Sequence, residues 1–159
     1  MKVIYIIDTC SIIDLKDIYP MDIFPSVWKK MGELYINGRL IAPEEVKKEI
    51  RDEELKEWIK NKKKMFIPPS PYQVNKVKEI LEKYPSLSKH KQPGGPNADP
   101  WLIALALELT DKPKILPNKY VIITEESKDK PGKIPAVASS YNIDCINLVE
   151  LFRKEGWKF

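Results

Sequence analysis

Near its start the chain contains Lys2-Val3-Ile4-Tyr5-Ile6-Ile7-Asp8-Thr9-Cys10-Ser11, an apolar run followed by an acid and small polar residues. Residues 3–7 are all β-branched or aromatic, which is typical of a strand that is buried on both faces. Such strands belong to parallel sheets that helices cover on either side. The run ends at Asp8, so an acid directly follows the first strand. Because open α/β sheets bind ligands beyond the carboxyl ends of their strands, Asp8 is the first candidate site residue.

Outward from this strand, apolar runs alternate with helical patterns, as they do in βαβ units. We expect further strands at residues 40–42, 65–67, 120–124 and 143–146. We expect helices at residues 9–15, 24–35, 43–50, 53–64, 74–81, 100–109, 134–141 and 148–155. Residues 83–96 and 125–133 are polar and contain Pro and Gly, so they are expected to be loops. These patterns predict an α/β fold with a central, mostly parallel sheet, in a single domain over residues 1–159.

The composition limits the classes of function. The 159 residues carry 27 basic and 23 acidic side chains, for a net charge of +4, which mildly favours a polyanionic partner. A hydrophobic content of 43% with 31% charged residues excludes disordered and fibrous classes. No apolar run approaches the roughly 18 residues that a membrane span requires. We therefore expect a cytoplasmic protein without a membrane partner.

The two cysteines and the single histidine do not match the spacings of metal, redox or imidazole-based sites. Cys10 and Cys145 match no zinc or redox spacing, so we expect two buried or inert thiols in a reducing compartment. The single His90 excludes chemistry that needs two imidazoles. The chain also lacks both Gly-rich phosphate-loop motifs, since Gly94-Gly95 is too short for either.

Two acids are candidates because of their places in the expected elements. Asp8 either caps the helical turn that follows or faces a ligand at the sheet edge, and its position alone does not decide between the two. Glu49 stands three residues after Val46 and one before Ile50, at the edge of an apolar helical stripe. A carboxylate there either points toward the top of the sheet or is a solvated helix residue.

Two further sites on the chain place acids at the ends of elements. Asp99 precedes Pro100 and is in phase with the apolar face of the next helix, where it is also expected to be an N-cap. Asn97 stands close enough in sequence to line the same spot. Glu125 and Glu126 directly follow the strand that ends at Thr124, although a charged turn would also explain them.

Together these acids predict a metal site, because carboxylates that lie close together repel one another and a divalent cation relieves the repulsion. Ligand sets made only of oxygen favour Mg²⁺ or Mn²⁺ over Zn²⁺. A cation held this way activates a water and stabilises the leaving oxygen at a phosphorus. Lysines around such a site would hold a phosphate backbone without selecting bases.

Four segments resemble the PIN-domain family, the fold of the VapC-type toxin ribonucleases, and the resemblance covers nearly the whole chain. The first is the opening strand with Asp8-Thr9-Cys10-Ser11, and the second is Pro43-Glu44-Glu45-Val46-Lys47-Lys48-Glu49-Ile50. The third is Ala98-Asp99-Pro100-Trp101-Leu102-Ile103-Ala104, and the fourth is Val121-Ile122-Ile123-Thr124-Glu125-Glu126. Glu126 departs from the more usual Asp, and Glu125 is the alternative. Inserts at residues 85–96 and 112–118 indicate a divergent, PIN-like branch.

The resemblance implies a three-layer α/β/α fold and Mg²⁺- or Mn²⁺-dependent cleavage of RNA. Asp8, Glu49 and Asp99 would bind metal, and Glu126 would support a second ion or the water. Thr9, Ser11, Asn97 and Thr124 would surround the carboxylates and orient them. The family also implies a toxin of a toxin–antitoxin pair, with a small antitoxin protein and a homodimer as partners. The helix that contains Trp28 and Met31 would serve as an antitoxin surface only if it were not core.

Two alternatives stay open at this point. A non-catalytic RNA-binding or protein-interaction module would keep the fold without cleavage, and the lysine run Lys60, Lys62, Lys63 and Lys64 would favour it. A solvated helix end explains that run more simply. A nuclease that cuts DNA would use the same acids.

Overall fold

The computed structural model describes residues 1–88 and 97–159 of the chain. The strands are β1 (Lys2–Ile7), β2 (Leu40–Pro43), β3 (Phe66–Ile67), β4 (Asn118–Ile123) and β5 (Asp144–Ile146). The helices are α1 (Thr9–Ile18), α2 (Pro25–Ile36), α3 (Glu44–Glu49), α4 (Glu53–Ile59), α5 (Pro71–Lys83), α6 (Asp99–Asp111), α7 (Ile134–Ser140) and α8 (Leu148–Lys154). Two 3₁₀ turns, η1 (Lys63–Met65) and η2 (Pro85–Ser88), complete the described elements.

The five strands form one sheet in the order β3-β2-β1-β4-β5, and every pairing is parallel. In the β1–β4 pair Ile7 lies opposite Ile123, so these two strands end at the same level. The chain leaves β1 toward β2 on one side and reaches β4 on the other side only later. The boundary between β1 and β4 is therefore the point where strand order reverses, which is where α/β sheets bind ligands.

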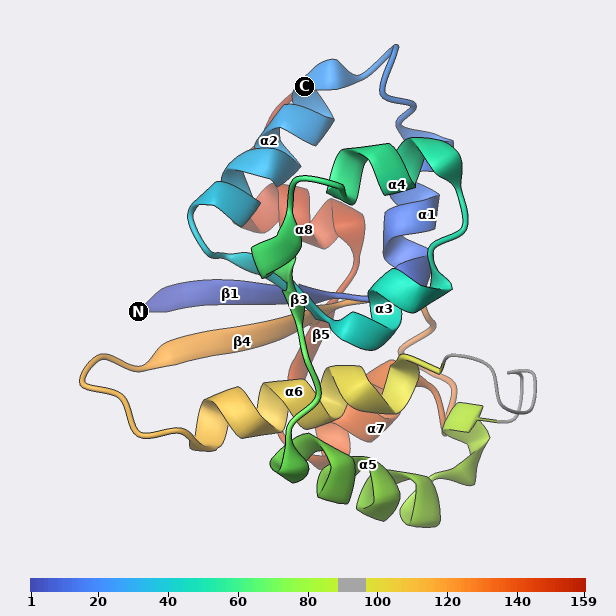
Figure 1. Ribbon diagram of the computed structural model, residues 1–159, viewed down its shortest axis with the longest axis vertical. Helices are drawn as coiled ribbons and strands as arrows, with labels where there is room; N and C mark the ends of the chain where they lie inside the picture. The colour runs from blue at the N-terminus through green and yellow to red at the C-terminus, as the bar shows by residue number, and fades with distance from the viewer. Residues whose placement is uncertain (89–96) are drawn as a thin grey trace.

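Helices cover both faces of the sheet, as the three-layer α/β/α expectation requires. Figure 1 shows α1, α2, α4 and α8 above the sheet and α5, α6 and α7 below it. The first strand is buried on both faces, since Tyr5, Ile6 and Ile7 have no exposed surface. The composition of residues 3–7 thus correctly predicted the central strand, and the expected α/β fold is confirmed.

The helix α2 belongs to the core. Its apolar face is made of Val27, Trp28, Met31 and Leu34, and all four are buried. Trp28 also donates its indole N–H to the carbonyl oxygen of Tyr19 at 2.7 Å. The interpretation of this helix as core is therefore correct. Among the described residues, no helix is long and apolar enough to cross a membrane.

Several element boundaries differ from the sequence expectation, and α1 and α5, for example, are longer than expected. The expected helix at residues 53–64 ends at Ile59, and beyond it the ammonium of Lys62 donates to the carbonyl oxygen of Trp58 at 2.7 Å. Pro43 ends β2 and precedes α3, and is not the first helical residue. The local apolar pattern does not fix such boundaries.

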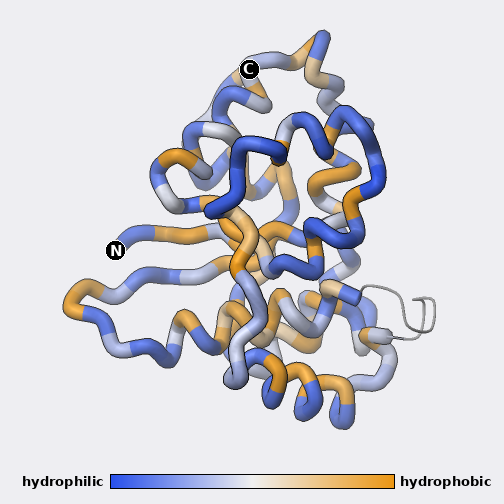
Figure 2. The backbone as a smooth tube through the Cα atoms, in the orientation of Figure 1, coloured by the Kyte–Doolittle hydropathy of each residue, from blue (hydrophilic) through white to orange (hydrophobic). Residues whose placement is uncertain are grey.

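The region expected to be a loop at residues 83–96 contains more structure than predicted. Helix α5 begins after Ser70, whose hydroxyl accepts from the Gln73 amide at 3.1 Å, and it continues to Lys83. A 3₁₀ turn follows at residues 85–88. His90 and Gly94-Gly95 lie outside the described residues. Figure 2 shows hydrophobic positions along β1, and also at the tip of the loop before β4, where Ile115 and Leu116 are exposed.

Candidate functional site

Asp8 stands at the carboxyl end of β1, directly beside the end of β4. Its amide donates to the carbonyl oxygen of Ile123 at 3.0 Å, which extends the pairing of the two strands by one residue. Its carboxylate Oδ1 accepts from the Ser11 amide at 2.7 Å and so caps α1. The capping interpretation is thus correct, and the cap lies at the place where strand order reverses.

The environment of Asp8 disfavours its charge. The side chain is only 2% exposed. Burial raises the pKa of this carboxyl from 3.8 to about 6, and hydrogen bonds from Ser11 and Thr124 oppose the rise. The nearby carboxylate of Glu126 raises the pKa further. A bound cation would offset both the burial of this charge and its repulsion by the second acid.

Glu49 points toward this edge and does not extend into open water. The Thr9 hydroxyl donates to its Oε1 at 2.6 Å, and the Ala98 amide donates to its Oε2 at 3.3 Å. The carboxylate therefore joins the start of α1, the end of α3 and the start of α6. Of the two orientations that the sequence left open, the structure has the one directed at the sheet.

Asp99 opens α6 and lines a pocket of about 200 Å³ at the same edge. The pocket is lined by Cys10, Ser86, Leu87, Asp99, Glu126, Gly132 and Lys133. The expectation that Asp99 is an N-cap is wrong by one position, because Ala98 before it already has helical angles and Asp99 is the first helical residue. Asn97 precedes them, and its buried Oδ1 accepts no hydrogen bond from any described residue.

The two acids after β4 point in different directions. Glu126 lines the pocket, and its Oε2 accepts from the Ile134 amide at the start of α7 at 2.8 Å. Glu125 accepts from the Leu148 amide at the start of α8 at 2.7 Å. The alternative that assigned the fourth position to Glu125 is therefore disfavoured, since this side chain stabilises the end of another helix.

The acids share an edge of the sheet without forming a closed cage. Within residues 1–88 and 97–159, no three Asp, Glu, His or Cys side chains gather closely enough to hold a metal ion as they stand. Backbone N–H groups hold the carboxylates of Glu49 and Glu126. A cation would have to share these oxygens with the N–H donors or draw Glu126 away from Ile134.

Five residues of the pocket were not expected from the sequence: Cys10, Ser86, Leu87, Gly132 and Lys133. Cys10 was expected to be buried or inert, but it is exposed at the pocket, because its position at the start of α1 turns it outward. Cys145 is half-buried, and burial raises the pKa of its thiol to about 12. Lys133 brings a cation to the pocket, and Ser86 donates to the Gly132 carbonyl oxygen at 3.0 Å. The Pro131-Gly132 turn was the local signal for this loop, but nothing in it indicated the contact with Ser86.

The comparisons with known proteins identify the family. The model of the domain of unknown function DUF4411 matches residues 5–159, which is nearly the whole chain. The chain therefore belongs to this family. No curated protein and no solved structure shows significant similarity to it.

Proposed function

We propose that this DUF4411 protein is a metal-dependent endoribonuclease, which hydrolyses phosphodiester bonds of RNA at the carboxyl edge of its sheet. The observation that supports this most strongly is the convergence of Asp8, Glu49, Asp99 and Glu126. They come from four segments that are far apart in the sequence. Asp99 and Glu126 line one pocket, and Glu126 lies close enough to Asp8 to raise its pKa. Glu49 accepts hydrogen bonds from Thr9 and Ala98, the residues next to Asp8 and Asp99. The resemblance to PIN domains assigns the same four positions.

The donor set fits a hard divalent cation. The carboxylates of Asp8, Glu49 and Asp99 would hold Mg²⁺ or Mn²⁺, with Glu126 on a second ion or on the attacking water. The buried Oδ1 of Asn97 adds a neutral oxygen that accepts no hydrogen bond from a described residue. When bound, the metal would supply an activated water and charge stabilisation at the phosphorus.

The remaining residues position these oxygens. The Thr9 hydroxyl fixes one oxygen of Glu49, and Thr124 hydrogen-bonds Asp8. Ser11 acts twice, because its amide holds Asp8 and its hydroxyl donates to the Ile123 carbonyl oxygen at 3.3 Å. Such outer partners keep carboxylate ligands oriented. Lys133 at the pocket supplies a cation for a substrate phosphate.

A cleavage assay tests this function. A mixed RNA pool incubated with Mn²⁺ or Mg²⁺ should be cut by the wild type to products with 5′-phosphate ends. Asp8→Asn and Asp99→Asn should reduce the rate at least a hundredfold, as removal of charge-stabilising groups does elsewhere. EDTA should stop the reaction. Asp17→Asn, an exposed change on the same helix as the Asp8 cap, is the matched control and should cut normally. Full activity in either site variant would contradict the proposal.

The proposal includes a place in a toxin–antitoxin pair, which rests on the PIN resemblance alone. Expression of the wild type should then arrest growth, whereas Asp8→Asn should not. Growth arrest by both proteins would show that the toxicity does not depend on the Asp8 carboxylate.

A second candidate is a non-catalytic RNA-binding module. It is favoured by the absence of a closed cluster of three ligands among the described residues and by the engagement of Glu126 with Ile134. This candidate predicts RNA binding that survives EDTA, weakens with salt and leads to no cleavage in any metal.

A further inference from the structure

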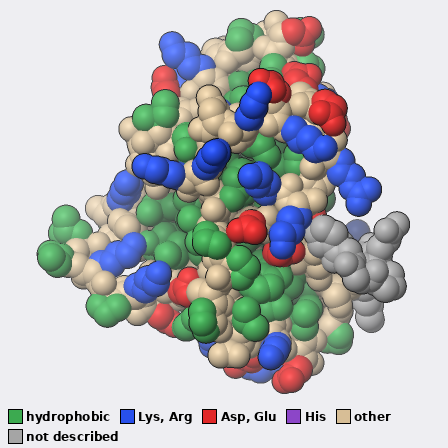
Figure 3. Space-filling view, viewed as in Figure 1, with side chains coloured by type: hydrophobic (Ala, Val, Ile, Leu, Met, Phe, Trp, Pro, Cys, Tyr) green, Lys and Arg blue, Asp and Glu red, His purple; other side chains and the backbone are tan. Residues whose placement is uncertain are grey.

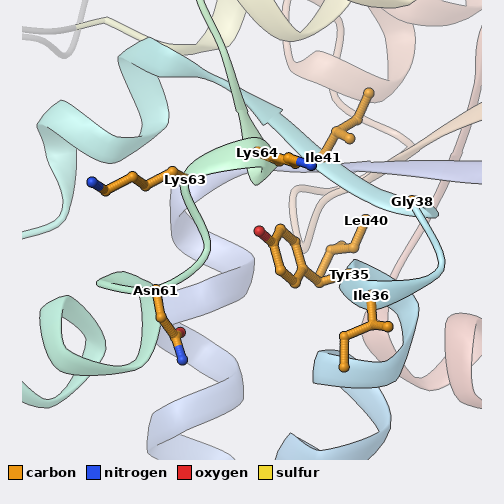
Figure 4. A pocket seen from close by; sticks show the side chains of 8 residues that line it. All are labelled: Tyr35, Ile36, Gly38, Leu40, Ile41, Asn61, Lys63 and Lys64. Carbon is orange, nitrogen blue, oxygen red and sulfur yellow. The ribbon is translucent and has the colours of Figure 1, made fainter.

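A second cavity, of about 520 Å³, lies at the amino end of β2, away from the acidic edge. Its walls are the last turn of α2, the first residues of β2 and the segment 61–64 before β3. Figure 4 shows the Tyr35 ring between the side chains of this segment and those of β2. The volume lies within the range of small-ligand sites, which is about 300–1,000 Å³.

The cavity is lined by one aromatic residue, by aliphatic residues and by two lysines. Its apolar lining includes Tyr35, Ile36, Leu40 and Ile41. Tyr35 is half-buried, and its hydroxyl forms no hydrogen bond within the described part of the chain. Ile36 is 78% exposed, so the apolar surface continues to the outside.

Two lysines, Lys63 and Lys64, line the same cavity, and Figure 4 shows the Lys63 side chain extending away from the Tyr35 ring. Lys63 and Lys64 are both exposed, and neither forms an ion pair with any described residue. Asn61 adds an amide beside them. Figure 3 shows Lys and Arg side chains around hydrophobic surface across the middle of this face. Of the lysine run, Lys63 and Lys64 line this cavity, whereas Lys60 stands at the end of α4, as the helix-end interpretation expected.

We propose that this cavity binds a short stretch of single-stranded RNA, in which Tyr35 stacks on a base and Lys63 and Lys64 hold the adjacent phosphates. Aromatic platforms with cations beside them are how proteins hold single strands without selecting sequence. The assignment rests on the proposed function, and it adds a substrate-holding site that is separate from the acids. Charge complementarity favours this occupant, because uncompensated ammonium groups match a polyanion and the ring matches its bases.

An equilibrium binding assay tests the cavity without any cleavage. A fluorescent RNA of about 12 nucleotides is titrated with the full chain in EDTA, and anisotropy reports the Kd. Lys63→Ala combined with Lys64→Ala should raise the Kd about tenfold at low salt. The slope of log Kd against log salt should fall by about 1.4, since each lost phosphate contact on a single strand removes about 0.7. Lys154→Ala combined with Lys158→Ala removes equal charge elsewhere and should change little.

The ring is tested by two substitutions. Tyr35→Leu should weaken binding about tenfold, and Tyr35→Phe should bind like the wild type, because stacking needs the ring and not the hydroxyl. Equal losses in the two lysine pairs would overturn the assignment. So would competition by polyglutamate with no effect of Tyr35→Leu, which would favour an acidic peptide as the occupant.

The outcome is distinguishable from that of the nuclease assay. If RNA binds in EDTA through Tyr35, Lys63 and Lys64 but is not cleaved in the presence of metal, the RNA-binding cavity is supported and the nuclease proposal is overturned. Cleavage in metal, with a Kd for RNA that does not change on substitution of these three residues, would support the nuclease proposal and overturn the RNA-binding cavity. No RNA binding at all would overturn it as well.

Discussion

Asp8 is a helix cap that is also buried, whereas most capping side chains are exposed to water. It caps α1 through the Ser11 amide, and it remains almost completely buried beside Glu126. A cap exposed to water would keep an ordinary acid pKa, whereas burial raises the pKa of Asp8 to about 6. At neutral pH the metal-free protein therefore holds a buried negative charge that costs stability.

This cost predicts a pH-dependent effect of Asp8→Asn on stability in metal-free buffer. Because the folded-state pKa is raised, the contribution of Asp8 to stability is fully present below about pH 4 and is lost as the pH rises to about 6. The Asn variant keeps an oxygen for the Ser11 amide and carries no charge. Above pH 6 it should be more stable than the wild type by about 1–3 kcal/mol.

Urea unfolding at about pH 4 and about pH 7.5, with EDTA in both buffers, measures this difference. The advantage of Asp8→Asn should shrink toward zero at the lower pH. An equal difference at the two pH values would show that the charge of Asp8 does not decide it.

The adjacent acids Glu125 and Glu126 lead to opposite expectations for substitution. Glu125→Gln loses a charged acceptor at the start of α8 and should lower stability by about 0.5–1 kcal/mol with cleavage unchanged. Glu126→Gln should reduce cleavage strongly, because its carboxylate lines the acid pocket. Thermal unfolding and the cleavage assay, run on both variants, give the comparison. If Glu125→Gln lost cleavage and Glu126→Gln kept it, the assignment of the fourth acid would be reversed.

At the scale of elements, the loop before α7 depends on one backbone conformation. Gly132 has a φ of +80°, and a Cβ there would collide with the Ser86 hydroxyl and lie 3.2 Å from the Ser86 Cβ. Ser86 and Gly132 both line the acid pocket. Only glycine adopts this conformation at little cost, so the residue holds η2 close to the turn before α7.

Gly132→Ala should therefore destabilise the protein by about 1–2 kcal/mol. Gly32, in the interior of α2, is the matched control, since a Cβ there meets no atom within 4 Å. Gly32→Ala should stabilise by about 0.5–1 kcal/mol through its higher helix propensity. Denaturant midpoints of the two variants measure both effects. The prediction is wrong if both changes stabilise.

Elements and their ends were predictable to different degrees. The strand at residues 3–7 and the core face of α2 follow from composition and periodicity, and the structure has both. The orientation of Glu49 at the end of α3 depends on the Thr9 hydroxyl and the Ala98 amide, which lie about 40 and 50 residues away in sequence. The helix expected to run to residue 64 ends at Ile59, and the Lys62 ammonium then contacts the carbonyl oxygen of Trp58. Local patterns carry no signal for such contacts.

At the scale of the whole molecule, the strand order explains why distant acids meet. Parallel strands bring their carboxyl ends to one edge, and the order β3-β2-β1-β4-β5 places β1 beside β4. Neither the order nor the exact register is encoded in any single segment. The sequence predicted most of the strands and helices to within a few residues, and the topology decides which of their ends are neighbours.

The topology also separates two surfaces. The acids lie at the carboxyl edge, and the cavity that contains Tyr35 lies at the amino end of β2. A strand of RNA held at the second surface would raise its local concentration at the first without contributing to chemistry. Changes at Tyr35 should therefore raise KM and leave kcat nearly unchanged, whereas changes at Asp8 should lower kcat.

The most direct test of the central claim is the affinity for Mn²⁺, because it needs no knowledge of the substrate. Calorimetric titration of the wild type should show binding at the acidic edge. Asp8→Asn, Glu49→Gln and Asp99→Asn should each weaken that binding at least tenfold, and Asp17→Asn should not. Two results would contradict the account that these carboxylates form one metal centre. One is a folded wild type that binds no Mn²⁺, and the other is an affinity for Mn²⁺ that is the same in the wild type and all four variants.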